Sequence, residues 1–198
     1  MRLFLAVFPP PEVQRAAFAI EEELRRSGDG VSWVKLGNLH YTMRFLGELG
    51  EDGARRAAEA AAEAAAGALE SPAALGALGA FPSSRRARVL WVSLSEGAEE
   101  LANLARALED ALKRRGFGRA DQRFSAHLTL GRVRVPGPDW TDRLAAVKLP
   151  DPAATRFTVD RLLLVESHLS PRGSTYTVRT EALLASGDPS RLPPRGTS

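Results

Sequence analysis

The sequence predicts an α+β protein in which helices cover sheets. Two observations lead to this prediction: segments of strand character and of helix character follow one another in mixed order through the 198 residues, and no linker divides them. With 44% hydrophobic residues, the chain has enough apolar surface to bury a core without disulfides, and it contains no cysteine. We therefore expect one domain over residues 1–185.

The first half of the chain alternates strands with helices. Residues 2–8 are a short apolar run, which indicates a buried strand. A run of prolines then marks a helix start, and apolar residues at helical spacing continue from Val13 to Leu24. The alternation in residues 39–47 predicts a second strand, and the alanine-rich residues 51–69 predict an amphipathic helix.

The second half contains more strand segments than helices. Strands are expected over residues 75–81, 89–94, 124–135, 155–167 and 175–180. Helices are expected over residues 98–115 and 139–147. Residues 186–198 are rich in Pro, Gly, Ser and Arg, and we expect them to form a flexible tail.

The composition fits a cytoplasmic protein, and its mildly basic charge is weak evidence for an anionic partner. The net charge is +3, and arginine, the commoner basic residue, binds phosphate through two parallel hydrogen bonds. The same arginine and alanine content can also reflect genome composition alone. The apolar run at the start is shorter than a signal peptide requires, and no segment is long enough to span a membrane. We expect a cytoplasmic monomer.

Two of the three histidines lie in matching motifs. His40 is followed by Thr42 and an apolar residue, and His127 is followed by Thr129 and an apolar residue. Residues i and i+2 of a strand face the same side, so each motif presents one imidazole and one hydroxyl to the same surface. If the two strands approach each other, both imidazoles and both hydroxyls converge on one point.

Such a convergence suits a phosphate ester. Each threonine can donate a hydrogen bond to a non-bridging oxygen, while neutral imidazole takes up a proton and imidazolium gives one. No cofactor or metal is needed, because no carboxylate motif completes a ligand set around the histidines. The alternative for a single histidine is a structural, half-buried position, but the matched pair favours function. Ser125 lies near His127 without the turn of a serine nucleophile, and no glycine-rich phosphate loop is present.

Other side chains could assist the histidines. Arg44 shares the period-2 face of His40 and could neutralise the phosphate or simply lie on the surface, whereas Arg132 falls one residue off that face in a regular strand. His168 lacks the motif and is expected to be structural or exposed. RNA contact is conceivable for two further groups, although solvation or core packing is the more common role: the basic residues Arg85, Arg86 and Arg88, and the aromatic residues Phe45, Trp91 and Phe124.

The paired motifs and their flanks resemble the 2H phosphoesterase superfamily, and within it the RNA 2′,3′-cyclic phosphodiesterases, formerly called 2′-5′ RNA ligases. The resemblance extends from Arg2 to Tyr176 and includes residues 34–47, 88–92, 124–133 and 167–173. Two positions depart from the usual family pattern. Tyr41, where leucine is commoner, should face away from the catalytic side, and Gly131, where alanine is commoner, should face it and leave extra room.

The resemblance implies a bilobal fold, in which two pseudo-symmetric lobes of antiparallel sheet, covered by helices, surround a central cleft. It also implies hydrolysis of RNA or nucleotide 2′,3′-cyclic phosphates to 2′-phosphomonoesters, without a metal or other cofactor. His40 would be the proton donor and His127 the proton acceptor, and Thr42 and Thr129 would hold the phosphate. Arg132 lies at a basic position typical of the family. Two alternatives stay open: a 2′-5′ RNA ligase acting mainly in the joining direction, and a non-catalytic RNA- or nucleotide-binding protein.

Overall fold

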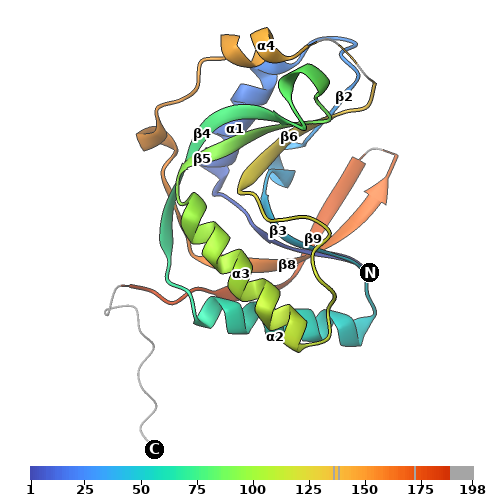
Figure 1. Cartoon of the computed structure of the whole chain (residues 1–198), viewed down its shortest axis with the longest axis vertical. Coiled ribbons are helices and arrows are strands. Elements are labelled where there is room, and N and C mark those ends of the chain that lie inside the picture. Colours follow the sequence, from blue (N-terminus) through green and yellow to red (C-terminus); the bar gives the residue numbers. More distant parts are fainter. Residues whose placement is uncertain (136, 138, 172, 188–198) are drawn as a thin grey trace, which may run out of the picture.

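The computed structural model describes residues 1–135, 137, 139–171 and 173–187 (Figure 1). The helices are α1 (Pro11–Leu24), α2 (Glu51–Ala66), α3 (Ala98–Arg114) and α4 (Thr141–Ala146). The strands are β1 (Arg2–Val7), β2 (Val31–Trp33), β3 (Tyr41–Glu48), β4 (Ser71–Phe81), β5 (Val89–Glu96), β6 (His127–Val133), β7 (Phe157–Val159), β8 (Arg161–Ser170) and β9 (Gly173–Leu183). Sheets and helices occur in mixed order, so the predicted α+β class is confirmed.

The strands form two halves of one curved sheet. Its order is β7-β4-β5-β6-β3-β1-β8-β9, with β2 paired to β6, and all of these neighbouring strands are antiparallel. Between the halves, within the described part of the chain, one residue pair joins β3 to β6: Tyr41 and Leu128. The expected pair of antiparallel lobes is therefore present, and the two motif strands lie where the lobes meet.

The helices cover the face of the sheet that holds the main core. In α3, the spacing of Leu101, Leu104, Leu108 and Leu112 places all four leucines in this core. In α2, small alanines are the buried residues, which lets α2 and α3 pack against each other; Figure 1 shows them side by side. Among the described residues, no helix has the length and apolar character needed to cross a bilayer.

The structure differs from several of the predicted strands. The strand predicted over residues 155–167 is two strands, β7 and β8, separated at Asp160. β8 continues beyond the predicted end at residue 167 to Ser170 and pairs with β9 as a long hairpin, so that His168 lies in a strand, opposite Thr175. The three-residue strand β2 was not predicted, because it is too short to show alternation. Most of the tail expected over residues 186–198 lies outside the described residues.

Candidate active site

The structure brings the two His-x-Thr motifs together at the junction of the lobes. Because Tyr41 pairs with Leu128 in an antiparallel register, one further step along the strands places His40 opposite Thr129, and Thr42 opposite His127. Tyr41 and Leu128 are fully buried in the core. Since side chains alternate between faces, the histidines and threonines project from the opposite face, which we call the catalytic face.

Backbone carbonyls orient both imidazoles in the same way. Nδ1 of His40 lies 2.7 Å from the carbonyl oxygen of Asn38, and Nδ1 of His127 lies 2.8 Å from that of Ser125. A carbonyl only accepts hydrogen bonds, so Nδ1 is the protonated nitrogen, and Nε2 is the nitrogen that can accept or donate a proton in a reaction. The hydroxyl of Thr42 lies 3.1 Å from Nε2 of His40 and donates to it when the ring is neutral.

Aromatic side chains enclose His40. Its ring stacks on Phe8 with centroids 5.1 Å apart, lies 4.9 Å from Phe4, and meets the edge of Tyr176 at 5.4 Å. This burial, reinforced by the positive charge of Arg132, lowers the pKa of His40 to about 4, despite the opposing hydrogen bond to Asn38. His40 is therefore neutral at pH 7 in the free protein.

The surroundings of His127 are similar but more open. Its ring meets the edge of Phe81, with centroids 5.1 Å apart, and lies 6.3 Å from Trp91. The indole of Trp91 lies flat on the sheet because its neighbour is Gly79, where a Cβ would come within 2.3 Å of the ring. Burial, together with the charge of Arg132, lowers the pKa of His127 below its usual value.

A β-bulge brings Arg132 to the catalytic face. The pairing of β6 with β5 skips Leu130 between Thr129 and Gly131, which shifts the alternation by one residue. Arg132 thus returns to the face of Thr129, although a regular strand would have placed it one residue off. Its charge lowers the pKa values of both His40 and His127, so the guanidinium lies within electrostatic range of both rings.

A second bulge removes Arg44 from the catalytic face, so the prediction that it shares a face with His40 is wrong. The pairing of β3 with β1 skips Met43 between Thr42 and Arg44. Arg44 therefore points to the helix-covered side, where Nη1 donates to both carboxylate oxygens of Glu109 at 3.1 and 2.9 Å. Its Nη2 donates to the carbonyl of Gly118 at 2.6 Å. Arg44 holds α3 on the sheet and does not face the histidines.

The bulge in β6 also corrects the expectation for Gly131. This glycine was expected to leave room on the catalytic side, but it faces the opposite side and is buried there. A Cβ at this position would lie 2.7 Å from Val31 and 2.8 Å from the ring of Trp33. The missing side chain therefore admits the indole of Trp33. Tyr41, in contrast, faces away from the catalytic side as predicted.

The remaining candidates are dispersed. Phe124 packs against the main core, and Arg85 lies 3.8 Å from Asp139 near α4. Phe45 and Trp91 both lie on the catalytic face, where Phe45 is 49% exposed. The residues that sequence reasoning missed are the aromatic neighbours of the two imidazoles. The sequence contained a signal for two of them, Phe4 and Phe8, because strand alternation places both on the same face of the strand predicted over residues 2–8. The missed residues are Phe4, Phe8, Phe81 and Tyr176.

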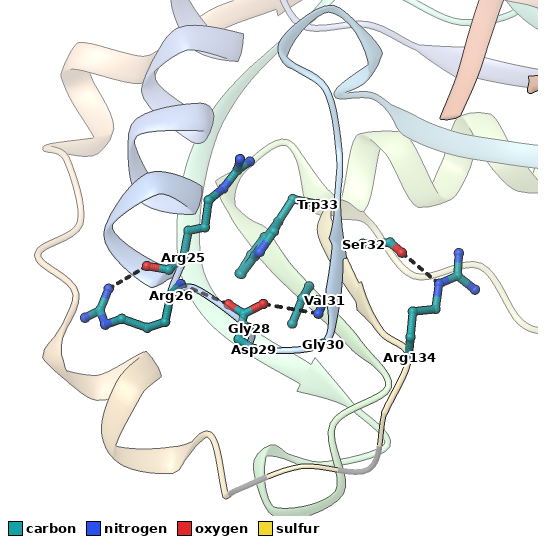
Figure 2. Close-up of a pocket in the computed structure, with 9 residues that line it drawn as sticks. All are labelled: Arg25, Arg26, Gly28, Asp29, Gly30, Val31, Ser32, Trp33 and Arg134. Carbon is teal, nitrogen blue, oxygen red and sulfur yellow. Dashed lines mark hydrogen bonds between the residues drawn. The ribbon is translucent and has the colours of Figure 1, made fainter. Parts of the chain in front are cut away.

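A hollow of about 440 Å³ lies away from the histidines, between the end of α1 and β2. Three of its lining residues are Arg25, Arg26 and Arg134, but Figure 2 shows that their guanidinium groups point in different directions. Asp29 is engaged by the backbone amides of Arg26 and Val31. The hollow therefore lacks the convergent donors of an anion site. Within the described part of the chain, no cluster of three or more His, Cys, Asp or Glu side chains is placed to hold a metal.

Comparisons with known proteins identify the family and the fold that this chain is similar to. A family model described as LigT-like phosphoesterase matches residues 7–91 and 92–176. An RNA 2′,3′-cyclic phosphodiesterase of Archaeoglobus fulgidus is 36% identical, over 89% of this chain and 96% of the relative. One of Thermotoga maritima is 30% identical, over 94% and 97%. The crystal structure of a Thermus thermophilus protein, TT0787, superposes with a TM-score of 0.78 at 28% identity, covering 95% of this chain and all of that one.

Proposed function

Because this chain belongs to the LigT-like phosphoesterase family of 2H phosphoesterases, we propose that it hydrolyses 2′,3′-cyclic phosphates of RNA or nucleotides to 2′-phosphomonoesters. The observation that carries the proposal is the register of β3 and β6, which sets each histidine opposite the threonine of the other motif. A tetrahedral phosphate between the strands meets two imidazoles and two hydroxyls. Acid, base and anion-binding groups are then available without a metal.

The reaction is an in-line displacement at phosphorus. His127 accepts a proton from water through Nε2 while the water oxygen bonds to phosphorus. The bond from phosphorus to the 3′ oxygen breaks, and His40 donates the proton that the departing oxygen needs. The product carries the phosphate on the 2′ oxygen. In this assignment the direction of proton flow comes from the family resemblance, because the two halves of the site are nearly symmetric.

Hydroxyl groups and Arg132 stabilise the charge on the phosphate. In the free protein Thr42 donates to Nε2 of His40, as its 3.1 Å contact indicates. When His40 is protonated, Nε2 no longer accepts, and the hydroxyl becomes free to donate to a phosphate oxygen. Thr129 has the corresponding place in the second motif. The Arg132 guanidinium, on the same face, opposes the negative charge that develops on the non-bridging oxygens.

The phosphate itself supplies the conditions for His40 to be protonated. Burial and Arg132 keep this imidazole neutral in the free protein. A bound phosphodiester anion offsets the charge of Arg132 and favours imidazolium, so the pKa of His40 rises on binding. The proton donor is thus prepared by the substrate that uses it.

The direct test is incubation with a 2′,3′-cyclic nucleotide and with an oligonucleotide that ends in a cyclic phosphate, both in the presence of EDTA. Phosphorus NMR then identifies which oxygen carries the phosphate in the product. We expect a 2′-phosphate and a rate that EDTA does not change. Loss of activity with EDTA and its return with added metal would overturn the metal-independent mechanism. A 3′-phosphate product would mean that the 2′ oxygen is the leaving group.

Histidine variants test the two-histidine mechanism. His40→Ala and His127→Ala should each lower kcat by roughly 10²- to 10⁴-fold, the usual contribution of a general acid or base. His168→Ala is the matched control, because this third histidine lies in β8, outside the paired motifs, and its side chain is 52% exposed. A variant of His40 or His127 that retains the activity of the control removes that residue from the mechanism.

The order of the two roles is tested by changing the leaving group. In a cyclic phosphorothiolate with sulfur at the 3′ bridging position, the departing thiolate needs no proton. If His40 is the donor, His40→Ala should be rescued with this substrate, whereas His127→Ala should stay defective. The reverse pattern would exchange the roles.

The joining direction uses the same site, since a 5′-hydroxyl of RNA can replace water as the nucleophile. RNA halves carrying a cyclic phosphate and a 5′-hydroxyl would measure it beside hydrolysis. We propose hydrolysis as the main activity, carried out by a cytoplasmic monomer.

A further inference from the structure

We propose that Arg2 and Phe45 form a binding subsite for the RNA strand immediately 5′ of the cyclic phosphate, in which Arg2 contacts the phosphodiester and Phe45 supports a nucleobase. This inference rests on the proposed function. It names two residues outside the histidine motifs and predicts that the enzyme prefers an RNA end to a cyclic mononucleotide.

The register of β1 and β3 places both residues on the catalytic face. Phe45 is the direct partner of Phe4, whose ring lies 4.9 Å from that of His40. Phe45 lies beyond the bulge at Met43, on the same face as Thr42, and roughly 10 Å further along the strand. The subsite therefore adjoins the phosphate site along one continuous surface.

The two halves of the protein differ at this position. Counted from its histidine, Phe45 occupies in the first motif the place that Arg132 occupies in the second, because both strands have a bulge after the threonine. One half thus offers a cation near the reacting phosphate and the other an aromatic ring. This difference gives the nearly symmetric site a direction for a bound strand.

Arg2 has the properties expected of a residue that binds a phosphate group of the substrate. Its guanidinium lies over the Phe45 ring at 4.9 Å from the centroid, and no carboxylate among the described residues pairs with it. Glu48, its partner across the strands, instead lies 3.3 Å from the terminal amine of Met1. The charge of Arg2 acts to lower the pKa of Tyr176, a neighbour of His40, so Arg2 lies within electrostatic range of the site.

Phe45 is exposed where a core residue would not be. Its ring is 49% exposed, and it begins an apolar row of cross-strand partners that continues through Phe4 and Val165 to Val178. Val178, at the other end of the row, is 47% exposed. Unpaired bases stack on aromatic rings and on arginine planes, and an arginine beside such a ring neutralises the adjoining phosphate. The combination fits a single-stranded RNA end.

Three substrates separate the contacts: a 2′,3′-cyclic mononucleotide, the same molecule with a 5′-phosphate, and a dinucleotide that ends in the cyclic phosphate. The measured quantity is kcat/KM for each, relative to the cyclic mononucleotide. In the wild-type protein we expect kcat/KM to be higher with the 5′-phosphate than without it, and higher again for the dinucleotide. Arg2→Ala should remove the step due to the 5′-phosphate, and Phe45→Ala the step due to the added base, each by about tenfold.

Conservative variants and a charge control complete the test. Arg2→Lys should restore part of the phosphate step, and Phe45→Trp should restore the base step. Arg15→Ala, which removes one exposed arginine from α1, should leave all three ratios as in the wild type. Equal kcat/KM values for the three substrates in the wild type, or ratios that Arg2→Ala and Phe45→Ala leave in place, would overturn the subsite. Failure to turn over any of them would instead contradict the proposed function.

Discussion

Arg44 is bound by Glu109 of α3 on the side of β3 opposite to His40, although Arg44 lies four positions after His40 and a regular strand would place both on the same side. Only the bulge at Met43 allows this. Arg132 shows the converse relationship, since the bulge at Leu130 brings it onto the catalytic face. In regular strands Arg44 would lie on the catalytic face and Arg132 on the opposite face, whereas the structure has the reverse. The two arginines should therefore differ in function.

The first prediction compares alanine variants of these arginines. Arg44→Ala breaks a partly buried ion pair and should lower the free energy of unfolding by about 1–3 kcal/mol, with little change in kcat/KM. Arg132→Ala should leave stability almost unchanged, because this side chain is exposed, and should lower kcat/KM by about 10²-fold. Urea denaturation and steady-state kinetics measure both effects. Equal kinetic losses in the two variants would show that Arg44 also serves the reaction.

The same bulges mark the limit of what the sequence could predict. Strand alternation correctly placed His40 with Thr42, and His127 with Thr129, because each motif is a regular stretch before the bulge. Beyond it the alternation reverses, and no residue type in the sequence announces that change. Tyr176 could not be predicted either, since only the β8–β9 hairpin brings it to His40. Local periodicity determined the motifs, whereas sheet pairing determined their surroundings.

The second prediction concerns pH. In the proposed mechanism the reactive enzyme carries one proton, shared between one acid and one base, and kcat/KM reports on the free protein. It should rise as pH increases through the lower of the two histidine pKa values and fall as pH increases through the higher one; the pKa of His40 is about 4. Both pKa values are lowered from 6.5, so the maximum of kcat/KM should lie below about pH 6.5, whichever histidine is the acid.

Profiles of kcat and kcat/KM, measured at constant ionic strength, check this prediction. The maximum of kcat should lie at higher pH than that of kcat/KM, because the bound phosphate anion raises both pKa values. If kcat/KM began to fall only above about pH 7.5, the pKa values of the two imidazoles would not be lowered as the structure indicates.

The third prediction concerns Asn38, which connects His40 to the β8–β9 hairpin. Its carbonyl accepts from Nδ1 of His40 at 2.7 Å, while its side-chain amide donates to the carbonyl of Ser174 at 2.8 Å. Asn38→Ala removes only the second contact. The hairpin should then hold Tyr176 less firmly on the imidazole, and the pKa of His40 should rise from about 4 toward 6.5 as solvent gains access.

Histidine titration by NMR measures that shift directly. Asn103→Ala is the matched control, because Asn103 lies on α3 and its side-chain oxygen accepts a hydrogen bond from Arg106 of the same helix. Removing it should leave the His40 titration unchanged. An unaltered His40 pKa in Asn38→Ala would mean that the hairpin stays in place without this contact.

The last prediction concerns Gly131 and separates packing from pocket shape. Gly131→Ala would place a Cβ 2.7 Å from Val31 and 2.8 Å from the Trp33 ring, so one of them must move. We expect a loss of about 1–3 kcal/mol in the free energy of unfolding. Activity measured well below the melting temperature should change little, because Gly131 faces away from the catalytic side. Gly118→Ala is the control, since a Cβ there meets no atom within 4 Å.

A double-mutant cycle identifies the cause of that loss. If the indole of Trp33 is the obstacle, Gly131→Ala should cost less in a Trp33→Leu background, with a coupling of about 1 kcal/mol or more. Additive losses would place the strain on Val31 or on the strand itself. A fall in kcat/KM without a loss of stability would show that Gly131 shapes the catalytic face after all, and that the bulge at Leu130 does not turn it toward the core as the β5–β6 register indicates.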